Sequence, residues 1–150
     1  MCQERICVDY SAEADISVNL NELPLPPIAG TSDIATAFDV LEHLEHPVDV
    51  LQWIPCNQLI VTLPNAKSWI ARHMEEKNGS KHLYSFTDYT ASILLGEGGW
   101  RVTSIEYQFG KWSLIAKTIN AIGSLWPSRM GTGIVLHCDR NGPTRGWSLR

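Results

Sequence analysis

The chain has 150 residues, of which 44% are hydrophobic and 19% charged, with 11 glycines and 8 prolines. This balance is typical of one compact domain rather than two. No segment reaches the roughly 18 consecutive apolar residues of a membrane-spanning helix, and no apolar stretch follows a basic start, so a secretion signal is not predicted. The four cysteines form no C-x-x-C pair, and a reduced, cytoplasmic protein is therefore expected.

Charge divides the chain into two unlike parts. Up to Leu63 ten acidic residues accompany one basic residue, a balance of −9, whereas from Pro64 onward eleven basic residues accompany six acidic ones, a balance of +5. The acidic part argues against a nucleic-acid partner, because such binding requires Lys and Arg to neutralise phosphates. The basic part either suits an anionic small molecule or a membrane surface, or is simply a solvated face.

In the first half, short apolar segments alternate with polar loops. The pattern predicts strands at residues 5–9, 15–18 and 33–38. Residues 19–27 contain three prolines and cannot continue a strand or a helix. Residues 39–46 form a charged turn or a helix start, and Pro47 suits the first turn of a helix that runs to about Trp53.

The second half contains the strongest strand pattern, a nearly continuous apolar run at residues 57–63. Residues 66–77 have helical composition. Ser85, with Asp88 three residues later, resembles a capping box and predicts a helix to about Leu95. The predicted helix terminators are Gly96, Gly98 and Gly99. Further strands are predicted at residues 100–109 and 133–138, followed by a flexible tail at 139–150.

A further helix is predicted from Trp112 to about Leu125, because apolar residues recur there at spacings of three and four. It either packs against the sheet, forms a wall of the acceptor site or, through residues 112–126, contacts a membrane surface. Alternating strands and helices predict an α/β domain with a mainly parallel sheet, in which ligands bind beyond the carboxyl ends of the strands. Those ends carry Asp9, Asn19, residues 38–43 and residues 64–65, which are expected to form one cleft.

Four segments resemble a known family in order and spacing. They are residues 33–47 (DIATAFDVLEHLEHP), 59–65 (LIVTLPN), 82–89 (HLYSFTDY) and 98–106 (GGWRVTSIE). They look like class I S-adenosylmethionine-dependent methyltransferases of the small-molecule type that includes the ubiquinone-biosynthesis O-methyltransferase. The resemblance covers residues 5 to 138 and implies a Rossmann-like, three-layer αβα fold, S-adenosylmethionine as cofactor and a small-molecule acceptor.

The resemblance also implies cofactor contacts. Asp9 would accept hydrogen bonds from both ribose hydroxyls. Asn19 and Leu20 would lie at the adenine, where Asn19 replaces the usual Asp and loses its charge. The methionine part of the cofactor would lie along Phe38, Asp39 and Glu42. Structural alternatives remain for three of these residues: a solvated acid at a strand end for Asp9, a turn-forming residue for Asn19 and a helix-start residue for Glu42.

For chemistry, His43 is the first candidate for a general base, because an imidazole titrates near neutral pH, and His82 is the second. Asn65, Arg72 and Tyr84 are predicted to line the acceptor pocket. This interpretation includes no metal site. A metal-dependent hydrolase built on Asp39, His43 and His46 is an alternative, although it needs a further ligand and lacks the H-E-x-x-H motif.

One departure from the family concerns glycine. The family's first strand ends in a glycine-rich loop that wraps the amino-acid end of the cofactor, whereas no glycine precedes Gly30 in this sequence. Residues 1–138 are therefore expected to form a partial, N-terminally truncated domain with weak or no cofactor binding in isolation and doubtful activity on its own. The alternative is a non-catalytic assembly module that associates with itself through an exposed strand edge.

Overall fold

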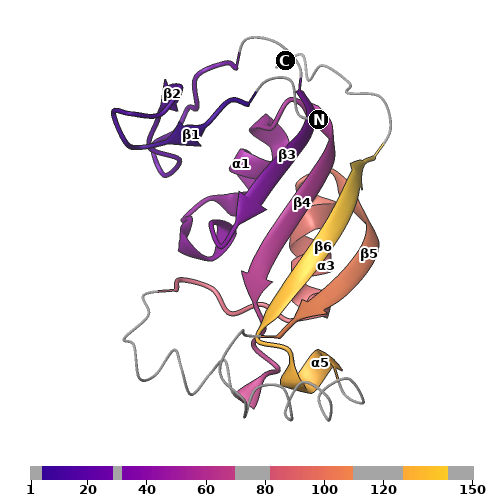
Figure 1. The fold of residues 1–150 in the computed structure, drawn as a ribbon. Helices are drawn as coiled ribbons and strands as arrows, with labels where there is room; N and C mark the ends of the chain where they lie inside the picture. The colour runs from indigo at the N-terminus through magenta and orange to yellow at the C-terminus, as the bar shows by residue number, and fades with distance from the viewer. Residues whose placement is uncertain (1–4, 29–31, 70–81, 110–126, 142–150) are drawn as a thin grey trace.

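The computed structural model describes residues 5–28, 32–69, 82–109 and 127–141. These residues form a four-stranded mixed sheet, a separate two-stranded sheet and helices packed on one face of the larger sheet (Figure 1). The predicted helix at 112–125 and Arg72 lie outside the described residues. Within the described ranges, no helix is both long enough and apolar enough to span a bilayer.

The larger sheet has the strand order β3-β4-β6-β5. β4 lies parallel to β3, whereas β6 runs antiparallel to both of its neighbours, β4 and β5. The sheet is therefore mixed, with its one reversed strand between β4 and β5. The bounds are β3 Ser32–Phe38, β4 Cys56–Pro64, β5 Trp100–Gln108 and β6 Gly133–Arg140.

These four strands were predicted to within two residues at each end. β4 is the most buried of them, with Leu59, Val61 and Leu63 turned toward the helices, in agreement with its nearly unbroken apolar sequence. The predicted tail was partly wrong, because β6 continues through Arg140. Two contacts of the Arg140 side chain stabilise this end of β6: its guanidinium stacks on the Trp100 ring at 4.1 Å and donates a hydrogen bond to the Cys56 carbonyl.

The N-terminal strands are much shorter than predicted. β1 (Val8–Asp9) and β2 (Ile16–Ser17) pair in parallel over two residues each. Parallel strands normally require a crossover of a dozen or more residues, and the short turn between these two strands limits their pairing. Asp15 stabilises the turn by accepting a hydrogen bond of 2.7 Å from the Cys7 N–H.

The described residues include three α-helices, of which the shortest, α5 (Pro127–Met130), lies just before β6. α1 (Pro47–Trp53) begins with proline in its first turn, as predicted. α3 (Asp88–Glu97) is capped by Thr87 with Thr90, so the predicted cap at Ser85 was wrong. Gly96 lies within the last turn of α3 and does not end it; Gly98 follows the helix, and Gly99 adopts a left-handed φ of 86°.

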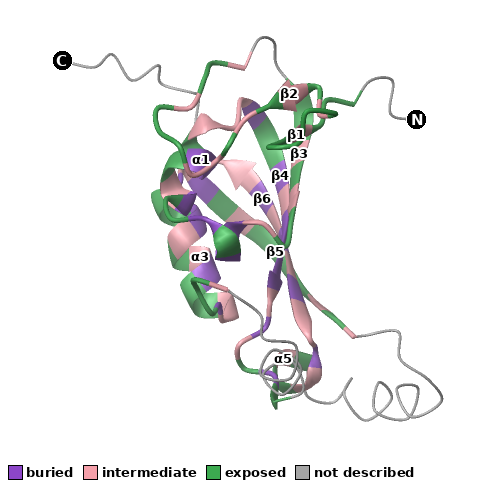
Figure 2. Ribbon diagram, turned by 90° about the vertical axis from the view of Figure 1, so that its left-hand side faces the viewer, coloured by how far each residue is buried: buried purple, intermediate pink, exposed green. Residues whose placement is uncertain are grey.

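The core lies between the main sheet and α1 and α3, which cover the same face of the sheet (Figure 2). Leu51 of α1 and Leu95 of α3 are fully buried against the inner side chains of β4 and β6. Trp100 joins the two layers, since its indole N–H donates a 2.9 Å hydrogen bond to the Leu51 carbonyl. The predicted α/β class is therefore confirmed, and its parallel pair β3–β4 places two carboxyl ends side by side.

Candidate functional site

The chain turns sharply where β3 ends. Asp39 adopts a φ of 51°, a left-handed conformation that is uncommon for residues other than glycine. Thr62 of β4 holds it there: the Asp39 N–H donates to the carbonyl and hydroxyl oxygens of Thr62, both at 3.1 Å, and the Thr62 hydroxyl donates to Asp39 Oδ1. Backbone conformations of this kind concentrate at functional sites. The turn leads directly into a 3-10 helix, η1 (Leu41–His43).

Glu42, on η1, is fully buried, with 0% of its surface exposed. Neither of its carboxylate oxygens has a hydrogen-bond partner within the described part of the chain. Burial raises the pKa of Glu42, and the negative charge of Asp39 raises it further, whereas His43 and His82 lower it. A buried charge without a partner is costly, so a perturbed carboxyl group at a strand end is a candidate for a functional role.

The loop before α3 brings His82 to the same place. The backbone N–H groups of Leu83 and Tyr84 both donate to the Glu42 carbonyl, at 2.8 and 3.3 Å. The His43 and His82 rings consequently meet edge to face, with centroids 4.8 Å apart and an interplanar angle of 62°. The two predicted base candidates thus lie together, each with a ring nitrogen within 4.8 Å of a carboxylate oxygen of the buried Glu42.

Glu42, His43 and His82 form the site that the structure defines most clearly. Each offers one potential ligand atom, and these three atoms all lie within 4.8 Å of one another. Glu42 is buried, His82 half-buried and His43 exposed, so the group opens to solvent on the side of His43. The metal-ligand set suggested for a hydrolase was Asp39, His43 and His46; His46 does not belong to the group found among the described residues.

The residues predicted to line the acceptor pocket lie in different surroundings, and their role in binding an acceptor stays a prediction. Tyr84, two residues after His82, is exposed at the surface. Its hydroxyl donates a hydrogen bond of 3.2 Å to the Glu45 carbonyl. Asn65 is instead fully buried, and its amide donates to the carbonyls of Ser128 and Gly131. These bonds give Asn65 a structural role, tying the end of β4 to the turn before β6.

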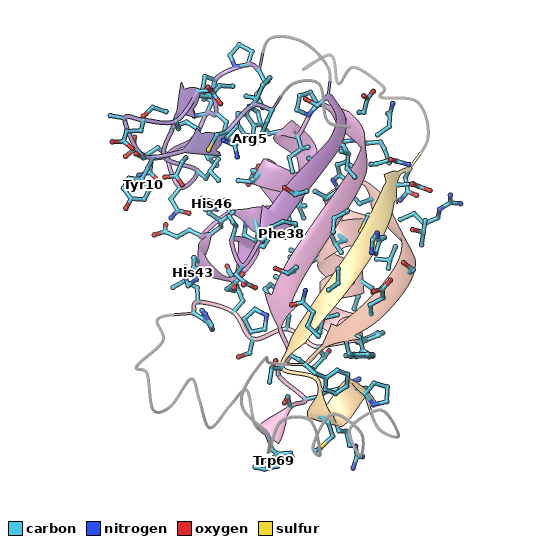
Figure 3. The ribbon with its side chains drawn as sticks, viewed as in Figure 1. Arg5, Tyr10, Phe38, His43, His46 and Trp69 are labelled. Atoms are coloured by element: carbon cyan, nitrogen blue, oxygen red, sulfur yellow. The ribbon has the colours of Figure 1, made fainter. Side chains whose placement is uncertain are left out.

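The predicted nucleoside-binding residues come from a different sheet. Among the described residues, β1 and β2 pair with each other and with no strand of the main sheet, so the expectation that all the strand ends form one cleft was wrong for these two strands. In Figure 3, Phe38 lies at the end of β3 and His43 on the 3-10 helix that follows, whereas Tyr10, the neighbour of Asp9, projects from the two-stranded sheet. A hydrogen bond of 2.9 Å from the Glu45 N–H to Asn21 Oδ1 links the two regions.

Asp9, Asn19 and Leu20 make local contacts within this region. Asp9 Oδ1 accepts a 3.0 Å hydrogen bond from the Ser11 N–H. Asn19 uses both polar atoms of its side chain in a turn, donating to Glu22 and accepting from the Asn21 N–H. Leu20 packs against the hydrophobic core. The turn-forming alternative therefore describes Asn19 as it lies in this structure, and the cofactor contacts of all three residues stay predictions.

The described residues fit one end of S-adenosylmethionine better than the other. Asp9 is exposed at a strand end, where a carboxylate can accept hydrogen bonds from ribose hydroxyls. Phe38, 56% exposed at the end of β3, offers an apolar surface. Within the described ranges no glycine-rich turn follows a strand, since Gly98 and Gly99 follow α3, and Gly131 and Gly133 border the start of β6.

Sequence reasoning identified Glu42, His43 and His82 separately but not as one group. Glu42 was assigned to the cofactor and the histidines to proton transfer. The available sequence signal was an adjacent Glu-His pair at a strand end together with a second histidine preceding a helix. What the sequence could not provide was the burial of Glu42 and the backbone contacts that bring His82 to it.

Comparison with known proteins supports the fold. No protein-family model matches the chain, and no curated protein matches it. An S-adenosylmethionine-dependent methyltransferase from Mesorhizobium loti superimposes with a TM-score of 0.56 at 14% identity, covering 89% of this chain and 78% of that one. A Thermotoga maritima methyltransferase, described as a possible histamine N-methyltransferase, gives 0.54 at 18% identity, covering 88% and 70%.

A third solved structure, a SAM-dependent methyltransferase from Archaeoglobus fulgidus, gives a TM-score of 0.52 at 16% identity. The matched region covers 73% of this chain and 60% of that one. This chain has the Rossmann-like fold of the class I S-adenosylmethionine-dependent methyltransferases, and it spans from three fifths to about four fifths of the length of these three structures.

Proposed function

We propose that this chain takes part in transferring a methyl group from S-adenosylmethionine to a small-molecule acceptor. The observation that carries the proposal is the convergence of Glu42, His43 and His82 at the carboxyl end of β3, the part of an α/β sheet where ligands bind. The fold adds support, because the three structures described above are S-adenosylmethionine-dependent methyltransferases.

When bound, S-adenosylmethionine supplies an electrophilic methyl group on a positively charged sulfur. An acceptor oxygen or nitrogen attacks the methyl carbon with a lone pair, and the carbon–sulfur bond breaks with its electron pair going to sulfur. The acceptor proton must be removed near neutral pH. The protein's main contribution is to align the two reactants, and we propose that Asp9, Asn19 and Leu20 hold the nucleoside end while Phe38 and Asp39 border the reacting centre.

Within this proposal the acceptor lies against His43, His82 and Tyr84, on the exposed side of the cluster. His43 is best placed to receive the acceptor proton, because it is the exposed member of the cluster. His82 would orient the His43 ring through their edge-to-face contact.

Cofactor binding provides the first test. The six tryptophans allow S-adenosylmethionine to be titrated by intrinsic fluorescence, and we expect saturable binding that weakens at least tenfold in Asp9→Asn. Asp49→Asn, an exposed carboxylate on α1, is the matched control and should bind as the unmodified chain does. Absence of saturable binding up to millimolar cofactor would rule out the proposal for this chain.

A methyl-transfer assay is the second test. With radiolabelled S-adenosylmethionine and a panel of hydroxylated and amine acceptors, we expect label in the product, reduced at least a hundredfold in His43→Ala. His46→Ala alters an exposed histidine three residues further on, outside the cluster, and should retain activity. Equal rates of methyl transfer in the two variants would show that His43 takes no part in the reaction.

A non-catalytic assembly module is the second candidate, and one observation favours it. Within the described part of the chain, β3 is an edge strand of the main sheet, and the two-stranded sheet does not pair with it. An unpaired strand edge is a template for pairing with another chain. Light scattering after size exclusion distinguishes the candidates: an assembly module associates without cofactor binding, whereas a monomer at high concentration argues against it.

A further inference from the structure

We infer that a pocket between the end of β4 and α5 binds the anionic group of a small molecule, a carboxylate or a phosphate, through Lys67 and Arg129. The pocket is inferred from its own side chains. Only its use as part of the acceptor site rests on the proposed function.

The pocket has a volume of about 530 Å³ and lies where the end of β4 meets α5 (Figure 1). Its lining residues among those described are Ala66, Lys67, Ser128 and Arg129. Two of these four carry a positive charge, one carries a hydroxyl and none is acidic, so the pocket suits a negatively charged ligand. Both cations belong to the basic second half of the chain, for which an anionic small molecule was one expectation.

The polar side chains of the pocket have hydrogen-bond donors to spare. Arg129 is exposed, and its guanidinium, with five N–H donors, has no hydrogen bond or ion pair with a described residue. The Lys67 ammonium uses one of its three donors on Asp88. The two cations and this one carboxylate leave a net charge of +1. An oxyanion, which only accepts hydrogen bonds, matches such a set of donors.

The buried Asn65 fixes the two cation-bearing turns to each other. Its amide donates hydrogen bonds of 2.9 and 2.8 Å to the carbonyls of Ser128 and Gly131, which flank Arg129. Its side-chain oxygen accepts a hydrogen bond of 3.1 Å from the Lys67 N–H. The backbone on both sides of the pocket is therefore already ordered, and binding an anion has to order only the two cationic side chains.

One short segment connects this pocket to the cluster that contains His82. Near the start of the segment the Leu83 N–H donates to the Glu42 carbonyl, and at its end the Phe86 carbonyl accepts a 2.8 Å hydrogen bond from the Ala66 N–H. Four residues of chain span at most about 14 Å, which limits the separation of His82 from Phe86. A small molecule of that length can therefore reach both the cluster and the pocket.

If the proposed methyl transfer holds, the pocket defines the acceptor class. The acceptor would place its hydroxyl or amine at the His43–His82 side and a carboxylate or phosphate at Arg129, whose planar guanidinium can donate two parallel hydrogen bonds to either anion. Holding the acceptor at both ends would align the reacting atom with the methyl group. Hydroxy acids, amino acids and phosphate monoesters are therefore the expected acceptors.

The experiment uses the full chain without cofactor. Inorganic phosphate and acetate are titrated separately while amide proton–nitrogen correlation spectra are recorded, at low ionic strength because salt screens exposed charges. We expect saturable shifts at the amides of Lys67, Ser128 and Arg129 with at least one of the two anions, and the anion that binds more tightly identifies the preferred group. Shifts that stay linear with both anions, or that saturate equally at Arg101, would overturn the inference.

Variants test the two cations. Arg129→Gln and Lys67→Gln should each weaken anion binding at least about fivefold, because each removes a charged donor. Arg101→Gln is the matched control: Arg101 is an exposed cation on β5, outside the pocket, and should be dispensable. Circular dichroism checks folding, and Arg129→Gln carries the test if loss of the Lys67–Asp88 pair unfolds the other variant. Equal affinities in all three variants would contradict the assignment.

Kinetics test the use of the pocket in methyl transfer. For a hydroxy acid we expect Arg129→Gln to raise KM and leave kcat nearly unchanged, whereas the corresponding uncharged amide should react equally with both proteins. The same KM for the acid in Arg129→Gln and in the unmodified chain would overturn this use.

The result can be separated from that of the proposed function, since no cofactor or acceptor is present in the anion titration. Saturable anion binding by a chain that does not bind S-adenosylmethionine would support the pocket and reject the proposed function. Methyl transfer by a chain that binds neither anion would support the function and reject the pocket.

Discussion

Glu42 and Asn65 are both fully buried, with 0% exposure each, but their side chains differ in hydrogen bonding. The Asn65 side chain makes three hydrogen bonds, two donated to carbonyls and one accepted from the Lys67 N–H. The Glu42 carboxylate makes none within the described residues. The first residue therefore stabilises the fold, whereas the second weakens it unless something binds there.

For Asn65 this difference predicts a large loss of stability. Asn65→Ala leaves the Ser128 and Gly131 carbonyls and the Lys67 N–H without their partner, and each unsatisfied buried group costs about 1–3 kcal/mol. We expect the free energy of unfolding, measured by urea denaturation, to fall by about 3 kcal/mol. Asn57→Ala, at an exposed position of the same strand, is the control. A loss below about 1 kcal/mol would show that these bonds are replaced by water.

For Glu42 the expected sign is opposite. In metal-free protein, Glu42→Gln exchanges an unpaired buried carboxylate for a neutral amide of similar shape, and a neutral group is less costly to bury. We expect the free energy of unfolding to rise by about 1 kcal/mol in the presence of a chelator. Glu45→Gln, nearby and exposed, should leave it unchanged. A large destabilisation by Glu42→Gln would indicate that the carboxylate has a structural partner.

At the scale of single elements, the two glycines near the end of α3 differ in their surroundings. A Cβ at Gly98 would lie 2.6 Å from the Leu51 Cβ of α1, whereas a Cβ at Gly96 would meet nothing within 4 Å. Gly98 is thus required for α3 to approach α1, and Gly96 is a weak helix residue in an open position.

The same substitution should have opposite effects at these two glycines. Gly98→Ala should lower the free energy of unfolding by about 1–3 kcal/mol, the usual cost of overpacking a core. Gly96→Ala should raise it by up to about 1 kcal/mol, because alanine is the better helix former. Thermal melts of both variants show whether the two changes in stability are opposite in sign. Similar changes in both variants would mean that α1 and α3 move apart enough to accommodate the added methyl group at Gly98.

The first turn of α3 provides a pH-dependent contribution. The Lys67 ammonium, hydrogen-bonded to Asp88, lowers the pKa of that carboxyl group, with further help from the Tyr107 hydroxyl, which donates at 2.9 Å. Burial, and then the hydrogen bond with Asp88, raise the pKa of Tyr107 to about 12. A carboxyl whose folded pKa is lowered stabilises the fold above its unfolded pKa of about 3.9.

Asp88→Asn should therefore lower the free energy of unfolding at pH 7 by about 1 kcal/mol, a modest figure because the Asp88 side chain is 24% exposed to screening solvent. The difference should shrink as the pH falls below about 3.9, through the lower folded pKa of Asp88. Asp49→Asn, in the first turn of α1, is the control for helix position. Urea denaturation at pH 7 and pH 3 measures both, and a difference that is as large at pH 3 as at pH 7 would contradict the mechanism.

Elements were predictable where one physical signal dominated. Nearly continuous apolar runs defined β4, and proline defined the start of α1, so both were predicted to within a residue. The α3 cap was not, because Ser85-x-x-Asp88 and Thr87-x-x-Thr90 both suit the motif and only the hydrogen bonds decide between them. The strand predicted at residues 5–9 was too long for a different reason. Apolar composition indicates a strand, but the length of the strand depends on a pairing partner that composition does not specify.

Across the whole molecule, the described residues form two sheets that share no strand pairing. The regions touch instead through side chains: Asn21 accepts from the Glu45 N–H, and the Trp53 indole donates to the Pro26 carbonyl at 2.6 Å. Figure 1 shows β3 between the two-stranded sheet and the rest of the main sheet. Among the described residues β3 and β5 are the two edge strands of the main sheet, and the free side of β3 is one place where the sheet could accept another strand.

A charge on β3 should test whether this edge pairs with a second copy of the chain. Ile34, in β3, is 46% exposed, and Ile93, on α3, is 45% exposed, so the two form a matched pair. Light scattering after size exclusion should show a mass that increases with concentration for the unmodified chain and for Ile93→Lys. Ile34→Lys should remain monomeric, because a lysine on an edge strand disfavours edge-to-edge pairing. If all three remained monomeric at the highest concentration, the assembly candidate would be excluded and the β3 edge would need no partner copy.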